Sequence, residues 1–269
     1  GATFDIAVID KTSTNIGQYP SIAASGTTIG IAYYDVTNDA LRFARYTPTY
    51  GWQRFTVDGM TGMGSCGNAS ANAGKFADLL FTSAGQPVIT YQSNNGLNIA
   101  FGAALPTSQT YSWSCVSIDT SANVRGEGID MVLASDVPYI YHFDATAGAI
   151  RQVSCASSIS TCIATGSSAF VAEIVGSTGT TSSIVTRPSA RRTASGKAFV
   201  SYYSASLQGI AIASKDVGET SWTTEYIDTP PAGSSYVSQA GMYPYMTLNN
   251  FDLPSIFYRS NENWLKYFS

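Results

Sequence analysis

The sequence predicts an all-β fold, a five-bladed β-propeller, and three observations lead to this prediction. Short stretches with apolar residues at every second position recur along the 269 residues, without strong helical patterns between them. The stretch IGIAYYD at residues 29–35 has four counterparts later in the chain. The fifth repeat lacks one strand, and the first ten residues carry a strand of the missing kind. Four-stranded units that are repeated radially and closed by a terminal strand are typical of a propeller.

The second strand of each unit is the clearest element. Its five copies align without gaps, at residues 29–35, 88–93, 139–144, 199–204 and 255–260. A first strand precedes each copy, at residues 19–24, 76–81, 128–133, 187–192 and 243–248, and a third strand follows, at residues 40–45, 96–101, 149–154, 209–214 and 264–269. Turn residues such as SG, SAG and NNFD separate the first strands from the second strands, so we expect antiparallel hairpins.

The fourth strand of each unit begins with an aromatic residue and usually ends with Asp six positions later. This pattern occurs at residues 52–58, 113–119 and 222–228, and residues 170–176 keep the aromatic residue. The fifth unit has no such strand, whereas FDIAVID at residues 4–10 has the right spacing. We therefore predict a single domain, 1–269, in which residues 4–10 close the ring as the outermost strand of the last blade. The four-stranded antiparallel blades are expected at about 19–58, 76–119, 128–176, 187–228 and 243–269.

Composition and charge narrow the function classes. The formal net charge is −4 and the sequence pI is about 4.9, which argues against nucleic-acid binding because such surfaces are usually basic. No apolar run reaches the roughly 18 residues that span a bilayer, so membrane insertion is not expected. We expect either a mature secreted form or a domain of a larger surface or fibre protein.

The four cysteines and the single histidine bear on metal binding and on location. The chain has no CxxC pair and His142 is its only histidine, so neither a metal nor another cofactor is expected. Cys155 and Cys162 flank a short turn, which predicts a disulfide between them and leaves Cys66 to pair with Cys115. Two disulfides imply an oxidising location, outside the cell or at its surface.

The repeat pattern YPS…G…I.YYD…W….VD resembles that of bacterial secreted or surface β-propeller repeats. The resemblance spans the whole chain, and the architecture is similar to that of the propeller lectins. It implies an extracellular recognition or adhesion module, with a glycan or another cell-surface molecule as its ligand. The motifs themselves form blades and do not specify the ligand.

Aromatic residues recur at one position of the second strands and are expected to pack between blades. This column comprises Tyr33, Tyr91, His142, Tyr202 and Tyr258. The column residues lie two positions after apolar strand residues and so point to the same face of the strand. The rings should therefore lie in the core, with each hydroxyl bonded to a backbone group. We accordingly interpret His142 as a packing residue.

The face that carries the long linkers between blades is the expected binding face. The linkers at 59–75 and 229–242 exceed about 12 residues, a length that often marks functional loops. Tyrosines, amides and a few charges near these loops suit sugar rings, whose apolar faces stack on aromatic side chains. An alternative is that the loops only cover the ends of the blades. The predicted ligand-binding residues are Tyr19, Tyr34, Asp35, Gln92, Asp144, Tyr203, Tyr236, Tyr243 and Arg259.

Two further motifs are interpreted as structural turns. SKDVGETSW at 214–222 is similar to the Asp-box turn of sialidases, with one extra residue before Trp222, and it falls between a third and a fourth strand. DVTND at 35–39 places Asp35, Asn38 and Asp39 close together. Oxygen ligands at such spacing can bind calcium, but an Asx turn is the commoner use of these residues.

A glycoside hydrolase is the main alternative to a lectin-like module, and a protein-binding or structural propeller is a third interpretation. Glycosidases need two carboxylates about 5 to 9.5 Å apart. Asp78 and Asp130 occupy the same place in the innermost strands of adjacent blades and form the best catalytic pair in the alignment. Glu127 falls in a loop of this alignment, so no glutamate is expected near the central channel, and the lectin-like interpretation is preferred.

Overall fold

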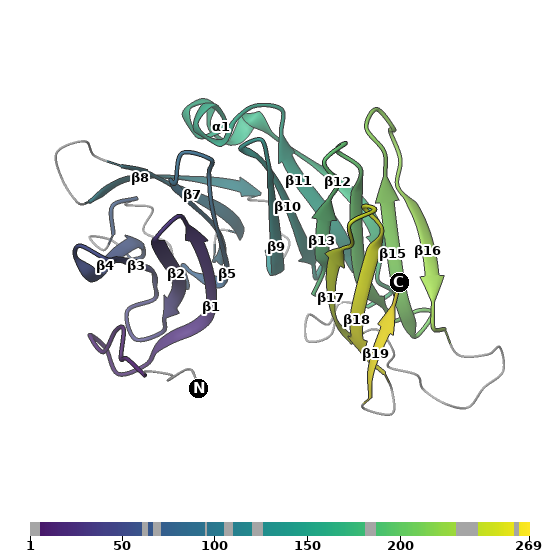
Figure 1. Ribbon diagram of the computed structural model, residues 1–269, viewed down its shortest axis with the longest axis horizontal. Helices are drawn as coiled ribbons and strands as arrows, with labels where there is room; N and C mark the ends of the chain where they lie inside the picture. Colours follow the sequence, from purple (N-terminus) through teal and green to yellow (C-terminus); the bar gives the residue numbers. More distant parts are fainter. Residues whose placement is uncertain are drawn as a thin grey trace. The chain divides into compact units, whose positions relative to one another are not determined.

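The computed structural model divides the chain into two compact units, Gly1–Val116 and Ser117–Ser269 (Figure 1). It describes residues 6–60, 64–66, 71–94, 96–104, 110–119, 126–180, 187–229, 242–260 and 264–269. None of the helices in these ranges is long and apolar enough to cross a membrane.

The first unit contains two antiparallel sheets of four strands, which we call blades one and two. In each blade the strands lie in chain order, so every neighbouring pair is a hairpin. Blade one comprises β1 (Ile16–Ser25), β2 (Thr28–Asp35), β3 (Ala40–Thr47) and β4 (Gly51–Asp58). Blade two comprises β5 (Lys75–Phe81), β6 (Pro87–Ser93), β7 (Gly96–Ala104) and β8 (Tyr111–Asp119).

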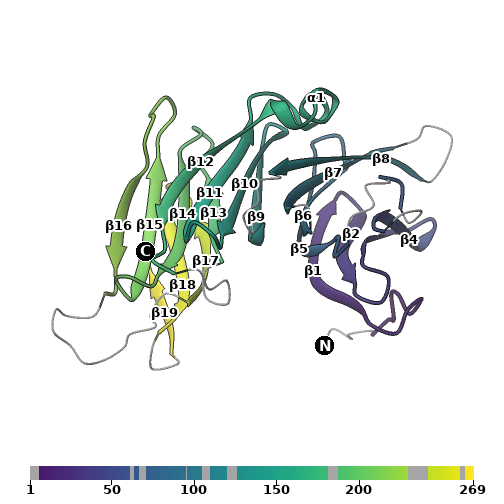
Figure 2. The same ribbon diagram turned by 180° about the vertical axis from the view of Figure 1, so that it is seen from behind.

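The second unit contains blades three, four and five, which Figures 1 and 2 show from opposite sides. Blade three comprises β9 (Glu127–Ala134), β10 (Val137–Asp144), β11 (Ala149–Cys155) and β12 (Phe170–Ser177), with α1 (Ile159–Thr165) and the short η1 (Ser167–Ala169) between its last two strands. Blade four comprises β13 (Ser189–Arg192), β14 (Ala198–Ser204), β15 (Gly209–Lys215) and β16 (Thr223–Ile227). Blade five has three strands in the described ranges, β17 (Met242–Leu248), β18 (Pro254–Arg259) and β19 (Leu265–Phe268). The all-β prediction with five repeated sheets is confirmed, whereas the helix α1 was not predicted.

Within each unit the first strands of successive blades are linked by one repeated hydrogen bond. A side-chain oxygen at the third position of the predicted first strand accepts a bond from a backbone N–H of the next blade. The bonds are Leu79 N to Ser21 Oγ at 3.0 Å, Ala190 N to Asp130 Oδ2 at 2.6 Å and Met246 N to Ser189 Oγ at 3.0 Å. The sequence alignment of the blades therefore corresponds to equivalent positions in space.

The tyrosine column of the second strands is buried, as predicted, but its hydroxyl groups have a different partner. The Tyr91 hydroxyl donates to Asp58 at 2.6 Å, and the Tyr258 hydroxyl donates to Asp228 at 2.9 Å. Both carboxylates come from the end of the fourth strand of the preceding blade, not from the backbone as expected. Asp58 and Asp228, which close the fourth-strand motifs of blades one and four, therefore join neighbouring blades.

Blade three departs from this arrangement at the end of its fourth strand. Gly176 stands where Asp58 stands in blade one, and Tyr202 is the column residue of blade four. A Cβ added to Gly176 would lie 2.0 Å from the Tyr202 hydroxyl oxygen, so the phenol fills the space that a side chain would need. Burial raises the pKa of the Tyr202 phenol to about 12, so the hydroxyl stays protonated at neutral pH.

Replacing Gly176 by Ala is expected to lower the free energy of unfolding by about 1–3 kcal/mol, the usual cost of overpacking a core. The companion change Tyr202→Phe removes the oxygen at 2.0 Å but leaves the ring carbon Cζ at 2.9 Å, so it should recover part of this loss when the two are combined. Urea unfolding of the wild type, both single variants and the double variant measures the coupling. Purely additive costs would contradict the assigned contact.

Residues 6–12 lie outside any strand, although residues 4–10 were predicted to form one. Residues 1–5 are outside the described ranges. The Tyr33 hydroxyl donates to Asp10 at 2.6 Å, Arg42 lies 3.3 Å from the same carboxylate, and Arg54 donates to the carbonyl of Ile9. The described part of this segment is thus attached to blade one, and closure of the ring by residues 4–10 stays a prediction.

Both predicted disulfides are confirmed, Cys66–Cys115 and Cys155–Cys162. The first joins the segment after β4 to strand β8, and the N–H of Cys66 also donates to the carbonyl of Val57 at 3.0 Å. The second joins the end of β11 to α1. The short helix is therefore held at the end of blade three by a covalent bond that the cysteine spacing had predicted.

Removing the two disulfides separately should cost different amounts of stability. The bonded cysteines are 49 residues apart in the first case and 7 in the second. Because a cross-link restricts the unfolded chain more when it closes a longer loop, we expect losses of about 4 kcal/mol and about 2 kcal/mol. Unfolding of the two Cys→Ser pair variants in urea tests the order, and equal losses would contradict it.

Candidate functional site

The first strands of four blades begin with a bulge that contains a residue of positive φ. The φ angles are 51° at Tyr19, 52° at Phe76, 55° at Gly128 and 53° at Tyr243. A left-handed backbone is uncommon for a bulky residue and costs of order 1–3 kcal/mol. Bulges of this kind redirect side chains and are frequent beside functional sites.

The bulge of blade three brings two carboxylates to one face of β9. Asp130 is paired with Tyr141, and Glu127 is paired with Phe143. The two partners are two residues apart in β10, whereas Glu127 and Asp130 are three residues apart in β9. Residues two positions apart in a strand point to the same face. Glu127 and Asp130 therefore project from the same side of the first strand.

This finding corrects the prediction that Glu127 lies in a loop and that no glutamate reaches the first strands. Glu127 is the first residue of β9, and its Oε2 atom is buried without a hydrogen-bond partner among the described residues. The ungapped repeat alignment began this strand at residue 128. Only the GEG sequence around Glu127 hinted at an irregular strand start.

A pocket of about 330 Å³ lies beside Asp130, at the beginnings of the first strands of blades three to five. Tyr243 and Tyr245 form one side of it, and their side chains are 50% and 60% exposed. The guanidinium carbon of Arg191 lies 5.4 Å from the centre of the Tyr245 ring. The remaining lining residues are Ile129, Arg187, Pro188, Ser189 and Pro244. We call this space the first-strand pocket.

The Asp130 carboxylate is held in place by its neighbours in blade four. Its Oδ2 atom accepts a bond from the N–H of Ala190 at 2.6 Å and lies 3.5 Å from a guanidinium nitrogen of Arg191. These two donors fix the orientation of the Asp130 carboxylate. An ordered carboxylate next to exposed aromatic rings and guanidinium groups provides the contacts that a sugar needs, namely stacking and hydrogen bonds to hydroxyl groups.

Asp78 occupies the position of Asp130 in blade two. It accepts a hydrogen bond from Ser21 Oγ at 2.9 Å, and the bulge of β5 places Lys75 on the same face. A lysine therefore stands in blade two where blade three has Glu127. Asp78 belongs to the first unit and Asp130 to the second, so the predicted pair is not brought together within one unit.

The predicted ligand-binding residues differ in their exposure. Tyr34, Asp35, Asp144 and Tyr203 are buried. Tyr19 and Gln92 are partly exposed, and Tyr243 and Arg259 are exposed. Tyr236 lies outside the described residues. Of the predicted set, only Tyr243 lines the first-strand pocket, so direct ligand contact by the other members stays a prediction.

Asp35 and Asp144 each hold the turn that follows a second strand. Asp35 accepts bonds from the N–H and the side-chain amide of Asn38, which agrees with the expected Asx turn at residues 35–39. Asp144 accepts bonds from two backbone N–H groups of the next turn and forms an ion pair with Arg151 at 2.8 Å. Within the described ranges, no group of three His, Cys, Asp or Glu residues could hold a metal ion.

The partly exposed aromatic residues of the first unit lie together. The ring centres of Tyr19 and Phe76 are 4.7 Å apart, and those of Tyr19 and Tyr34 are 6.4 Å apart. Burial and the hydrogen bond to Asp39 raise the pKa of the Tyr34 phenol. The bulged first strands of blades one and two therefore present aromatic rings, as the first strand of blade five does with Tyr243.

The comparisons with known proteins found similarity in fold but not in sequence. No protein-family model matches the chain, and no curated protein matches it. Two variants of exo-β-1,3-galactanase from Phanerochaete chrysosporium, solved with β-1,3-galactotriose, have TM-scores of 0.50 and 0.51 at 12% and 11% identity. The matches cover 95% and 97% of this chain and 60% and 62% of the galactanase chains, so this chain spans about three fifths of their length. The catalytic domain of an α-L-arabinofuranosidase from Coprinopsis cinerea gives a TM-score of 0.49 at 7% identity, and the match covers 97% of this chain and 92% of that chain.

This similarity supports a β-propeller fold and overturns the preferred functional interpretation. The prediction of a lectin-like recognition or adhesion module is wrong on this comparison, because the similar structures are glycoside hydrolases and not lectins or adhesins. The alternative that the sequence offered, a glycoside hydrolase, agrees better with the comparison.

Proposed function

We propose that the chain is a glycoside hydrolase whose catalytic carboxylates are Glu127 and Asp130. The observation that carries this proposal is the placement of both carboxylates on one face of β9, where Asp130 lines the first-strand pocket. The similarity in fold to an exo-β-1,3-galactanase adds to it. Glu127, Asp130 and the first-strand pocket all lie in the described part of the second unit.

The spacing of the two carboxylates suits glycosidic bond cleavage. Strand residues rise by about 3.3 Å, so the backbone positions of Glu127 and Asp130, which are two ladder positions apart, are separated by about 6.6 Å along the strand. Glycosidases hold their two carboxyl groups about 5 to 9.5 Å apart, on either side of the bond that breaks. The bulge is what creates this distance, since without it the two side chains would point to opposite faces of the sheet.

The environments of the two carboxylates assign them different roles. Asp130 is oriented by the N–H of Ala190 and by Arg191, which suits a charged base or nucleophile. Glu127, whose buried Oε2 atom has no donor among the described residues, is assigned the remaining role, transfer of a proton to the departing sugar oxygen. Tyr243 and Tyr245 provide stacking surfaces for sugar rings, and Arg187 and Arg191 provide donors for hydroxyl groups.

The pair of Asp78 with Asp130, which the sequence alignment offered, stays a prediction, because the two carboxylates belong to different units. Its support is that Ser21 orients Asp78 as Ala190 and Arg191 orient Asp130. In this variant of the proposal, Glu127 is dispensable and Asp78 is not. The two pairs are therefore distinguished by which carboxylate variant loses hydrolysis.

Ring closure by residues 4–10 is also part of the proposal. Asp10 accepts from Tyr33 and lies next to Arg42, just as Asp228 accepts from Tyr258 and Lys266. Asp228 follows the fourth strand of blade four and binds the blade after it. Asp10 holds the same place before blade one, which supports residues 4–10 as a fourth strand of the last blade. The two disulfides support a secreted or surface-displayed protein.

Hydrolysis of a panel of neutral polysaccharides tests the proposed activity. The panel includes β-1,3-galactan, arabinan, xylan and mixed β-glucans, with release of reducing ends as the measurement. We expect cleavage of at least one of them by the wild type and its loss in Glu127→Gln. No cleavage across the panel, or unchanged cleavage in both Glu127→Gln and Asp130→Asn, would contradict the proposal.

A further inference from the structure

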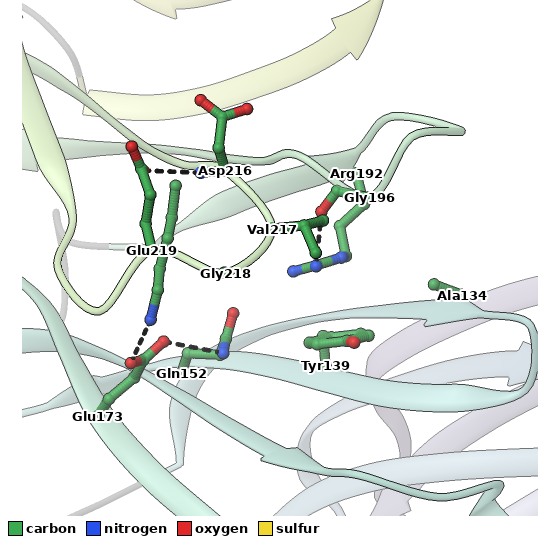
Figure 3. A pocket seen from close by; sticks show the side chains of 11 residues that line it. Ala134, Tyr139, Gln152, Glu173, Arg192, Gly196, Asp216, Val217, Gly218 and Glu219 are labelled. Carbon is green, nitrogen blue, oxygen red and sulfur yellow. Dashed lines mark hydrogen bonds and ion pairs between the residues drawn. The ribbon is translucent and has the colours of Figure 1, made fainter.

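A second pocket lies at the other ends of the strands of blades three and four, and we call it the hairpin pocket. Its volume is about 320 Å³. Blade three contributes Tyr139, Gln152 and Glu173, and blade four contributes Arg192 together with the hairpins at 193–197 and 216–222 (Figure 3). The predicted Asp-box turn is therefore one wall of a cavity as well as a connection between β15 and β16.

The walls of the hairpin pocket are held by a set of polar contacts. Glu173 accepts bonds from Gln152 at 3.0 Å, from Lys215 at 2.7 Å and from Trp222 Nε1 at 3.1 Å. The guanidinium carbon of Arg192 lies 3.7 Å from the centre of the Tyr139 ring. These contacts fix the side chains before any ligand binds, which lowers the entropic cost of binding.

Two buried polar atoms in the walls lack partners among the described residues. One is Oε1 of Gln152, whose residue is only 6% exposed, and the other is Nε of Arg192. Figure 3 shows the Gln152 oxygen pointing into the space below Val217 and Gly218. A buried polar atom without a partner costs about 1–3 kcal/mol, so a ligand that supplies the missing bond gains that energy.

The fold itself does not require an amide at this position. The residues at the place of Gln152 in blades one, two and four are Phe43, Ile99 and Ile212, and all three are buried. Each is paired across the ladder as Gln152 is paired with Tyr141. Blade five has Tyr267 at this place, so the amide occurs in blade three alone.

The equivalent space in the first unit is filled by aromatic side chains. Phe43 and Phe55 stand where blade three has Gln152 and Glu173, and Phe43 packs on Trp113 with ring centres 5.4 Å apart. Trp222 is the counterpart of Trp113, but it donates a hydrogen bond to Glu173 at 3.1 Å and meets the ring of Tyr141 edge-on, with ring centres 6.4 Å apart. The same position of the repeat is thus a sealed core in one unit and an open polar pocket in the other.

The charges around the hairpin pocket nearly cancel, which favours a neutral ligand. Lys215 is paired with Glu173 at 2.7 Å, and Asp216 is paired with Lys197 at 2.9 Å. Arg192 and Glu219 remain, one of each sign. A hydroxyl group both donates and accepts hydrogen bonds, so vicinal hydroxyls could bond to Gln152 Oε1 and to Arg192 Nε together.

We infer that the hairpin pocket binds one neutral glycosyl unit and so holds a saccharide away from the catalytic carboxylates. Its volume lies at the lower end of the range for small-molecule sites, which suits a single sugar ring. Val217 forms an apolar rim of the pocket, because it packs over Gly196. A Cβ added to Gly196 would lie 2.8 Å from a methyl carbon of Val217. The inference rests on the proposed function, because it takes its ligand class from the substrate of a glycoside hydrolase.

The test follows the indole N–H signal of Trp222 by NMR, since this group donates to Glu173 in the pocket wall. The signal is assigned with Trp222→Phe. The probes are β-1,3-galactotriose, arabinotriose, xylotriose and cellotriose at up to about 50 mM, added to the inactive Glu127→Gln protein. We expect a saturable shift with at least one probe, and about tenfold weaker binding in Gln152→Ile, the factor that loss of one hydrogen bond brings.

Controls separate a loss of the pocket from a loss of the fold. Gln152→Ile installs the residue that blade four has at this place, so it should fold, and Arg192→Lys is a second variant that removes the Nε donor. Glu225→Gln is the matched control, because Glu225 pairs with Ile212 as Glu173 pairs with Gln152 but does not line the pocket. Glu225→Gln should bind the probe as the parent protein does.

The outcomes distinguish this inference from the proposed function. A Trp222 shift without hydrolysis of any polysaccharide would retain the hairpin pocket as a saccharide site and overturn the catalytic assignment. Hydrolysis without a Trp222 shift for any probe would overturn the hairpin pocket alone. A shift that glycerol produces equally well, or one that Gln152→Ile and Arg192→Lys both leave unchanged, would also overturn it.

Discussion

Asp130→Asn is expected to lower kcat/KM for saccharide hydrolysis by about a hundredfold to ten-thousandfold, the range that positioned acid–base groups provide. Asparagine keeps the size of the side chain and its bond from the Ala190 N–H, which is 2.6 Å long in the wild type. It lacks the charge that a base or nucleophile needs. The fold should therefore persist while the reaction slows.

Glu127→Gln should show a different dependence on the leaving group. If Glu127 protonates the departing oxygen, its loss matters most for natural saccharides and least for aryl glycosides whose phenol leaves without a proton. We therefore expect a large loss on polysaccharide and a small loss on dinitrophenyl glycosides, whereas Asp130→Asn should be slow on both. Initial rates on the two substrate types provide the measurement.

Three further variants make this comparison decisive. Asp252→Asn changes an exposed carboxylate in a turn of blade five and should keep wild-type rates. Tyr243→Ala removes an exposed ring of the first-strand pocket and should raise KM more than it lowers kcat. Loss of hydrolysis in Asp78→Asn together with full activity in Glu127→Gln would replace the proposed pair by Asp78 and Asp130.

Asp10→Ala is expected to lower the free energy of unfolding by about 3–5 kcal/mol, because it removes one partner of a buried ion pair. The Asp10 side chain is 5% exposed, and its carboxylate binds both Tyr33 and Arg42. Alanine leaves the phenol hydroxyl and the guanidinium without this acceptor. Deleting residues 1–10 should cost at least as much, since the deletion also removes Ile9, whose carbonyl accepts a bond from Arg54.

The contribution of Asp10 should depend on pH. Burial opposes ionisation, yet the bonds from Tyr33 and Thr12 and the charge of Arg42 together lower the pKa of Asp10 below its ordinary value of 3.8. The stabilisation is therefore complete well above pH 3.8 and is lost as the pH falls through the lowered pKa. Urea unfolding of the wild type and Asp10→Asn at pH 7, 4 and 2.5 should show a difference that shrinks toward the lowest pH. A difference that is constant across this range would contradict the assigned ion pair.

Much of the fold could be predicted from the sequence because apolar residues recur at every second position of a strand that has one buried face. The third strand of blade one, expected at residues 40–45, is β3 (Ala40–Thr47), and the cysteine spacing predicted both disulfides. The helix α1 was missed because only seven residues form it and a disulfide holds it, so no amphipathic pattern is needed. Tertiary contacts decide such short elements.

The candidate site was harder to predict than the fold. Glu127 was missed because a bulge changes which residues share a face, and a bulge depends on pairing across the ladder, not on local composition. The open position at Gln152 was missed for a related reason. In the sequence, a single amide in a column of apolar residues gives no sign of a site, and only the structure shows that Gln152 Oε1 has no donor among the described residues.

The bulge at the start of the first strands has a consequence for how the blades can diverge. Beyond the bulge, Ser21, Asp130 and Ser189 are committed to the hydrogen bond that joins one blade to the next. Before it, the chain carries Gln18, Lys75, Glu127 and Met242 at equivalent positions, which differ in charge, polarity and size. The bulge thus separates the position that hydrogen-bonds the next blade from a position whose residue differs between blades. A substitution before the bulge can therefore change the chemistry of one blade and leave the hydrogen bond between blades in place.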